Sequence, residues 1–177
     1  MDDSELNRSP KSILGIFYRL KFNSRYSMTV WFRLSQYYFM KSLSCNRILK
    51  IIYQDLSNYY SRKNQIKNGL TSTPQTQIGR GIVFHHTNII ITSDTVIEEG
   101  VEVYGNVTFG LKDGKAPIIK SKAKIAGNSM VLGGVIVGEG AIVAPMALVL
   151  SDVPPGKIAA GIPAKVIGDV NEKNIQF

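Results

Sequence analysis

Two adjacent histidines, His85 and His86, are the only imidazole groups in the 177-residue chain. Imidazole has an unperturbed pKa of about 6.5 and is well suited to take a proton from a hydroxyl at neutral pH. Neighbouring residues on a strand point to opposite faces, so we expect only one of the two rings to face a given pocket. A structural histidine at a corner of the fold is the alternative. With one cysteine, Cys45, the sequence offers no zinc pattern and no internal disulfide, and it has no nucleotide-hydrolase phosphate loop.

A six-residue period surrounds and follows these histidines. Large apolar residues occupy the repeated position at Ile78, Phe84, Ile90, Ile97, Val103, Phe109, Ile119, Ile125, Val131, Val137, Val143 and Val149. One residue is inserted between Ile90 and Ile97, and residues 111–117 predict a loop. A period of six matches a short strand plus a corner, and three such sides make a coil of about 18 residues that stacks by parallel pairing. The period predicts a mainly β solenoid of about five coils over residues 78–168.

The first 70 residues have a different composition. They hold 12 Lys/Arg, 4 Asp/Glu and 7 of the 8 Tyr, whereas residues 71–177 hold 9 of each charge and 14 of the 16 Gly. A helix start at Ser9-Pro10 and apolar residues at helical spacing predict helices that carry three apolar stripes. The stripes are Ile13, Ile16, Phe17 and Leu20; Val30, Trp31, Leu34, Tyr37 and Tyr38; and Ile48, Ile51, Ile52, Leu56 and Tyr59. We expect them to pack between helices or against a partner subunit, with a basic membrane-binding or acidic-polymer-binding surface as the alternative.

These patterns divide the chain into a basic helical region over residues 1–70, a solenoid over 71–168 and a tail over 169–177. No basic stretch followed by an apolar core follows Met1, so we expect no signal peptide. The lone cysteine favours a cytoplasmic protein.

The solenoid sequence resembles the hexapeptide-repeat acyltransferases, and within them the serine acetyltransferases. The resemblance rests on four segments: Ile78-Gly79-Arg80-Gly81-Ile82, His85-His86, Gly105-Asn106-Val107-Thr108-Phe109-Gly110, and the closing run from Asp152 to Gly168 with Ala160-Gly161-Ile162-Pro163-Ala164. It implies a left-handed parallel β-helix, a homotrimer, acetyl-CoA as co-substrate without a metal, and an active site between subunits.

The resemblance also implies roles for individual residues. By the spacing of the repeat, Tyr104 and Asn106 lie one coil from His86 and are candidates for contact with the acceptor, while the resemblance makes His86 the general base and His85 a wall or orienting group. It assigns the acetyl-CoA site to Gly110, Gly127, Ala144, Lys157 and Lys165. Corner geometry for the small residues, core or corner roles for Tyr104 and Asn106, and solvated surface for the lysines are the alternatives.

Two positions depart from the serine acetyltransferase pattern. Ala116 stands where that branch has a second histidine, and Thr71 stands near the position of its acidic partner. Without a carboxylate, an imidazolium is less stabilised. With the short loop, these departures predict an open groove and favour a sugar hydroxyl of a capsular or extracellular polysaccharide as the acceptor.

Three alternatives accompany this prediction. Serine O-acetyltransferase of cysteine biosynthesis is the runner-up, and a non-enzymatic solenoid scaffold is the alternative of another class. The third, nucleic-acid binding, has only the net charge of +8 in its favour, because the neutral solenoid lacks a basic groove with stacking aromatic residues.

The basic residues 1–70 also indicate partners. They suit an acidic or lipid-linked glycan, or contact with the inner face of the membrane.

Overall fold

The computed structural model describes residue 21 and residues 23–171. The predicted Ser9-Pro10 helix start and the stripe of Ile13, Ile16, Phe17 and Leu20 lie outside the described residues.

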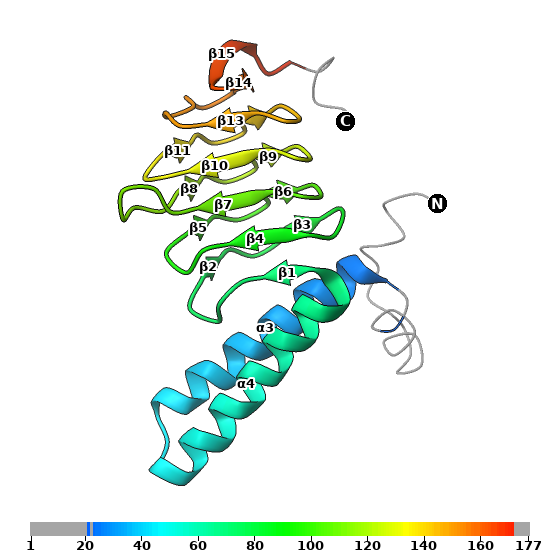
Figure 1. Cartoon of the computed structure of the whole chain (residues 1–177), viewed down its shortest axis with the longest axis vertical. Helices are drawn as coiled ribbons and strands as arrows, with labels where there is room; N and C mark the ends of the chain where they lie inside the picture. The colour runs from blue at the N-terminus through cyan, green and yellow to red at the C-terminus, as the bar shows by residue number, and fades with distance from the viewer. Residues whose placement is uncertain (1–20, 22, 172–177) are drawn as a thin grey trace.

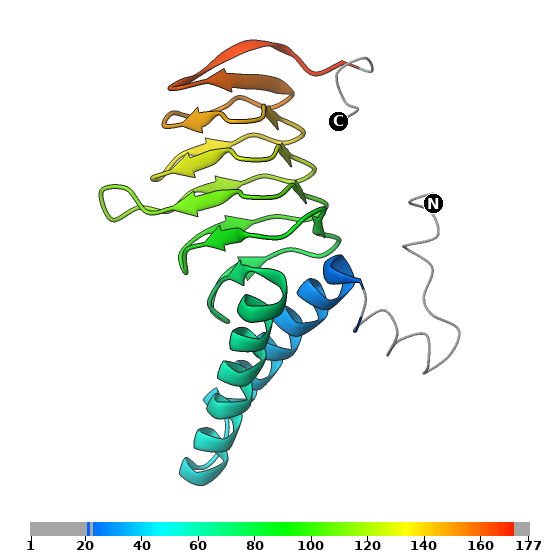
Figure 2. The same ribbon diagram turned by 45° about the vertical axis from the view of Figure 1, so that its right-hand side comes forward.

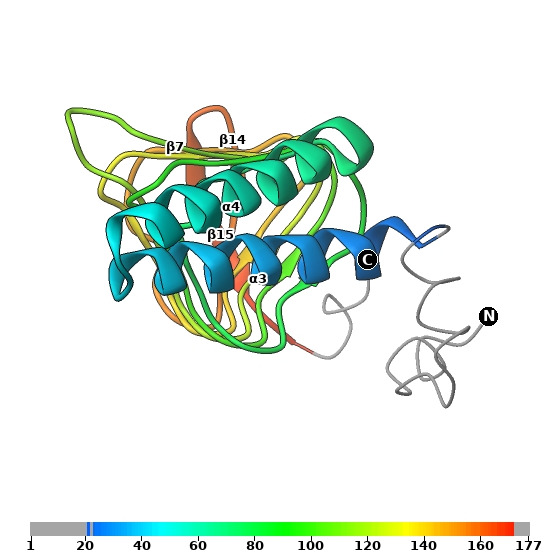
Figure 3. The same ribbon diagram turned by 90° about the horizontal axis from the view of Figure 1, so that it is seen from below.

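A helical hairpin precedes the solenoid and is formed by α3 (Ser24–Leu43) and α4 (Arg47–Asn68). Each helix begins after an asparagine whose side chain accepts a backbone N–H, with Asn23 capping α3 and Asn46 capping α4. Gly69 ends α4 in the left-handed conformation at φ 66°, which favours glycine. The helices lie side by side beneath one end of the solenoid (Figure 3).

Three sheets form the sides of the solenoid, and all their strands pair in parallel except β15 (Figure 1). The first sheet contains β1 (Leu70–Thr71), β4 (Ile89–Ile91), β7 (Thr108–Gly110), β10 (Met130–Leu132) and β13 (Leu148–Val149). The second contains β2 (Gln77–Ile78), β5 (Val96–Ile97), β8 (Ile118–Ile119) and β11 (Ile136–Val137). The third contains β3 (Val83–Phe84), β6 (Glu102–Val103), β9 (Lys124–Ile125), β12 (Ile142–Val143), β14 (Lys157–Gly161) and β15 (Ala164–Asp169).

The predicted solenoid is confirmed, and it is a left-handed parallel β-helix in which the chain climbs from β1 to β14 (Figure 1). Each strand from β1 to β14 turns at least one apolar side chain into the coil, and Phe84, Val103, Ile125, Val143 and Ala159 form one such inward column. The paired register places like residues on successive coils, so the core is continuous along the stack.

One coil differs from the predicted register. The repeat predicted Ile90 as the inward residue, but Ile90 is exposed, whereas its neighbours Ile89 and Ile91 are buried. Ile91 pairs with Phe109, so the extra residue lies between Phe84 and Ile91 rather than after Ile90. The insertion therefore falls in the corner that carries the two histidines.

Helix α3 covers the open end of the first coil. Met28 and Phe32 belong to the same hydrophobic cluster as the solenoid core. Arg33 donates to the backbone carbonyls of Ile78 and Gly79, and Gln36 donates to that of Thr76. These bonds satisfy carbonyls that no lower coil pairs. At the opposite end, β15 pairs antiparallel with β14.

The helix–helix seam does not use the apolar stripe predicted for α4. Its hydrogen bonds come from small polar residues, since Ser57 donates to the carbonyl of Ser35 and Asn64 donates to that of Met28, and the ring of Tyr38 stacks on that of Tyr60 across it. By contrast, Ile48, Ile51, Ile52 and Tyr59 of the predicted stripe are exposed, so packing within the hairpin is the wrong interpretation for them. Neither described helix combines the length and apolar character that a membrane crossing requires.

Candidate active site

The two histidines lie at the corner where the chain passes from β3 to β4, between the third and first sheets. Higher coils stack on this corner, since Asn106 N–H donates to the Thr87 carbonyl and Asn128 N–H donates to the Gly105 carbonyl. His86 is exposed, and no hydrogen bond joins its imidazole to another described residue. A side chain in this state is open to a substrate.

His85 is fixed on several sides, unlike its neighbour. Its Nε2 lies 2.9 Å from Glu102 Oε2, and Glu102 Oε1 lies 3.1 Å from Lys124 Nζ. The His85 ring stacks on Tyr104 with centroids 4.2 Å apart and an interplanar angle of 9°. Arg25 of α3 donates through Nε to the His85 carbonyl at 2.8 Å. The backbone next to His86 is therefore anchored both to the helical hairpin and to the next coil.

The carboxylate of Glu102 has a perturbed pKa. Burial raises it, but hydrogen bonds from His85 and Lys124 outweigh the burial and leave the pKa below its ordinary value. A carboxylate only accepts hydrogen bonds, so Nε2 of His85 carries the proton in this contact.

The expectation that the histidines occupy opposite faces does not describe this corner. Both rings lie beside Tyr104, with the His86 centroid 6.4 Å from that of Tyr104. The alternation rule applies to strands, and β3 ends at Phe84, so His85 and His86 follow the bend of the corner instead. Tyr104 is therefore beside both histidines: its ring stacks on that of His85 and is tilted relative to that of His86.

Asn106 lies one coil above the histidine corner. It adopts a left-handed backbone with φ 56° and donates from Nδ2 to Asn128 Oδ1 at 3.0 Å. The left-handed conformation recurs at this corner in Asn88, Asn128 and Met146. Corner geometry thus explains why an asparagine suits position 106, while its exposed side chain remains within one coil of His86.

The small residues assigned to acetyl-CoA do not all lie together. Gly127 and Ala144 lie on the same edge as His86, on successively higher coils. A Cβ at Gly127 would meet the Gly105 carbonyl oxygen at 3.3 Å, so this edge is narrow. Gly110 is buried in β7 on another side, where a Cβ would lie 2.7 Å from Leu132 Cδ2. Close packing accounts for that glycine.

The two lysines lie at the last coil. Lys157 begins β14 and forms an ion pair with Asp169 of β15. Lys165 is exposed on β15 and makes no ion pair with another described residue. Lys165 is therefore the more available cation at this end of the stack.

Thr71 and Ala116 lie on parts of the solenoid away from the histidine corner. Thr71 is exposed on the outer side of β1, within 3.5 Å of Gln65 Nε2. Ala116 lies in the loop between β7 and β8, at the corner between the first and second sheets. Figure 2 shows this loop projecting from the stack. Within one chain, the loop and His86 occupy different edges.

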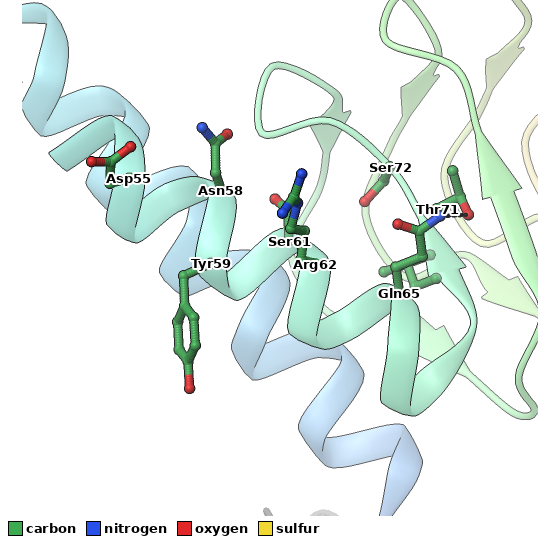
Figure 4. A pocket seen from close by; sticks show the side chains of 9 residues that line it. Asp55, Asn58, Tyr59, Ser61, Arg62, Gln65, Thr71 and Ser72 are labelled. Atoms are coloured by element: carbon green, nitrogen blue, oxygen red, sulfur yellow. Dashed lines mark hydrogen bonds between the residues drawn. The ribbon is translucent and has the colours of Figure 1, made fainter. Parts of the chain in front are cut away.

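A separate cavity of about 580 Å³ lies between α4 and the first coil (Figure 4). Its lining is mostly polar, with Asp55 and Arg62 as its charged side chains and Thr71 at its solenoid end. None of the predicted site residues lines it. Among residue 21 and residues 23–171, no group of three or more acidic, histidine or cysteine side chains is arranged to hold a metal ion.

Sequence comparison finds serine acetyltransferases. No family model matches the sequence. A putative serine acetyltransferase of Schizosaccharomyces pombe is 40% identical over 107 residues, which is 58% of this chain and 40% of the relative. The enzyme of Escherichia coli K12 is 38% identical over 101 residues, which is 54% of this chain and 37% of the relative. The chain thus spans well under half the length of these relatives.

Solved structures give the same result. A serine acetyltransferase in complex with CoA superposes with a TM-score of 0.70 at 26% identity, covering 80% of this chain and 56% of that chain. The serine acetyltransferase of Vibrio cholerae gives a TM-score of 0.76 at 25% identity, covering 96% of this chain and 64% of that one.

The six-residue repeat and the left-handed parallel β-helix give the chain the fold of the hexapeptide-repeat acyltransferases. Within that class it is similar to the serine acetyltransferases. The assignment to polysaccharide O-acetylation is therefore wrong, because the matched relatives are named for serine. That assignment relied on the departures at Thr71 and Ala116, and two positions weigh less than similarity over more than half the chain.

Proposed function

We propose that the chain transfers an acetyl group from acetyl-CoA to the hydroxyl of L-serine, with His86 as the general base. One observation carries the proposal: an exposed imidazole stands at a solenoid corner in a chain similar to serine acetyltransferases. The chain covers only part of its relatives, so L-serine is inferred as the acceptor from their names.

The reaction balances with one imidazole. Neutral His86 takes the proton of the serine hydroxyl while the oxygen attacks the thioester carbonyl carbon. The tetrahedral centre then expels the thiolate, the C–S bond breaks, and the imidazolium returns the proton to sulfur. A thiol has a pKa of about 8.5, so the leaving group needs little further assistance.

The edge above His86 has the side chains that a narrow pantetheine arm requires. Gly105, Gly127 and Ala144 are small, and they lie on successive coils spaced by about 4.8 Å. The small side chains leave room for the arm to lie against the backbone at these positions. Lys165 at the last coil offers a cation for the nucleotide phosphates.

Glu102 provides the carboxylate near the histidine corner that Thr71 does not provide, and it positions His85 beside the proposed base. It holds the ring of His85, and Arg25 holds the His85 carbonyl, so the peptide leading into His86 has little freedom. Preorganisation of this kind keeps the base in a reactive geometry. Glu102 acts through His85, which makes it a positioning residue.

A trimer completes the proposal. The outward column of the first sheet consists of Thr71, Ile90, Thr108, Met130 and Leu148, and its apolar members Ile90 and Met130 are exposed. Exposed apolar residues on an outer strand face are suited to burial against another subunit. Packing there would cover the edge of one chain with the loop of its neighbour, and would bring residues 111–117 of that neighbour toward His86.

The acceptor is tested by identifying the product. Purified chain is incubated with acetyl-CoA and L-serine, and mass spectrometry monitors O-acetylserine. L-alanine, which lacks the hydroxyl, is the matched control. We expect an acetylated product from L-serine and none from L-alanine. Release of CoA without acetylated serine would overturn the acceptor assignment.

A further inference from the structure

The turn end of the helical hairpin exposes a concentrated apolar surface. We define the hairpin tip as six exposed residues on either side of the turn: Met40, Leu43, Ile48, Leu49, Ile51 and Ile52. Ile48 is 73% exposed and Met40 is 62% exposed. Large exposed apolar patches mark surfaces that bind proteins or membranes, so the tip requires a partner.

The hairpin does not need these residues for its own packing. Its seam is satisfied by Ser35, Ser57 and Asn64, and by the stacked rings of Tyr38 and Tyr60 at 5.7 Å. The tip residues also lie outside the hydrophobic cluster of the solenoid. Their apolar character is therefore available for an external contact.

The tip carries positive charge without compensating acids. Lys41, Arg47 and Lys50 are exposed among the apolar residues. In the sequence, no Asp or Glu occurs between Glu5 and Asp55. Apolar side chains interleaved with Lys and Arg are the pattern of a segment that lies in the interface of an anionic bilayer.

The tip is also well placed to reach a flat surface. The end of α3 and the start of α4 project away from the coils, while the other ends of both helices contact the first coil (Figures 1 and 2). The tip would therefore reach a membrane before the histidine corner or the last coil does (Figures 1 and 2).

We propose that the hairpin tip docks the protein on membrane surfaces rich in anionic lipid. The apolar side chains enter the headgroup region, and Lys41, Arg47 and Lys50 pair with lipid phosphates. A second copy of the chain fits less well as the occupant, because a symmetric tip-to-tip contact would bring six cationic side chains together with no acid between them.

Vesicle flotation tests the proposal with the full chain. One set of vesicles contains phosphatidylcholine alone, and the other an equal mixture of phosphatidylcholine and phosphatidylglycerol. We expect binding to the anionic vesicles only, weakened by high salt. The Lys41→Gln/Arg47→Gln/Lys50→Gln variant should bind roughly a hundredfold more weakly, since each basic residue near an anionic surface contributes about fivefold.

The Ile48→Gln/Ile51→Gln/Ile52→Gln variant tests the apolar part and should lose about tenfold or more in affinity. Ile66→Gln is the matched apolar control, because Ile66 is exposed on the same helix but near its solenoid end. Lys122→Gln is the charge control on the solenoid. Both controls should bind as the unaltered chain does, and thermal unfolding should verify that every variant is folded.

Two results would overturn the proposal. One is equal binding to neutral and anionic vesicles, or binding to neither. The other is a fall in solution mass on substituting Ile48, Ile51 and Ile52, with no change in vesicle binding, which would make the tip a contact between copies. Acetyl transfer does not enter the readout, so the test is independent of the proposed reaction.

Discussion

Glu102 Oε2 lies 2.9 Å from Nε2 of His85, and it is the neighbouring His86 that stays exposed. The acidic partner that is absent at residue 71 thus comes from the next coil and fixes the histidine beside the proposed base. Two adjacent imidazoles consequently have different environments, one held in a hydrogen-bonded stack and one open to solvent. This division of roles yields a set of measurable consequences.

Replacing Glu102 with Gln should lower the free energy of unfolding in a pH-dependent way. The folded-state pKa of Glu102 is depressed, so its contribution is fully present above the ordinary glutamate pKa of about 4.3 and is lost as pH falls through the depressed value. We expect a loss of about 1 kcal/mol at neutral pH, measured by urea unfolding, that fades under acid conditions. Glu139→Gln, which alters an exposed pair with Lys122 at 3.9 Å, should change little. An equal loss at neutral and acid pH would contradict the assignment.

Placing a methyl group at Gly105 should displace His86. The added Cβ would lie 2.8 Å from the His86 Cβ, so one of them must move. We expect Gly105→Ala to lower kcat/KM for acetyl transfer by about a hundredfold through misplacement of the base. Gly168→Ala has no heavy atom within 4 Å of its added Cβ and serves as the control. Unchanged kinetics in Gly105→Ala would show that the position of His86 does not limit the rate.

Removing the Phe109 ring should destabilise the solenoid. Phe109 is fully buried and pairs in register with Ile91 and Val131 on the neighbouring coils. We expect Phe109→Ala to cost about 3–5 kcal/mol in chemical denaturation, because a cavity remains in a stack that cannot collapse around it. Leu111→Ala, at an exposed position just beyond the strand, should cost much less. Equal costs for the two variants would argue against a continuous core.

Charging the outer side of the first sheet should dissociate the proposed trimer. We expect the unaltered chain to have about three times its 19.5 kDa mass by light scattering, and Ile90→Asp/Met130→Asp to fall toward one chain. The physical cause is desolvation of unpaired carboxylates in an apolar contact. Ile167→Asp, exposed on β15, is the control and should keep the mass of the unaltered chain. A trimer that survives the double substitution would place the contact elsewhere.

The solenoid could be predicted because a single large apolar residue, such as Phe84 or Val103, recurs at the repeated position and fills the core of each coil. The position of the extra residue, before or after the inward isoleucine, could not be predicted, because Ile89, Ile90 and Ile91 are chemically alike. Only pairing with Phe109 distinguishes the inward isoleucine. The bend at the histidines was missed because the alternation rule was applied beyond Phe84, where β3 already ends.

Glu102 was missed as a site residue for a related reason. Its partner His85 is 17 positions away, and the contact depends on the register between β3 and β6. Stacking Phe84 on Val103 by the six-residue period would have placed Glu102 above Val83, two residues from His85. The apolar stripe of α4 led to a wrong prediction of helix packing, because Ser57 and Asn64 make the contacts with α3 and most of the stripe is exposed. Helical spacing identifies a face but not what covers it.

The steady-state rate of acetyl transfer to L-serine in His86→Ala and His85→Gln variants tests the central claim most directly. Both variants should be folded, since His86 is exposed and glutamine can still hydrogen-bond at position 85. The proposed role predicts that His86→Ala lowers kcat by about 10²–10⁴-fold, the usual contribution of a general base, while His85→Gln lowers it far less. A His86→Ala variant that retains the rate of the unaltered chain, or a His85→Gln variant that loses as much as His86→Ala, would contradict it.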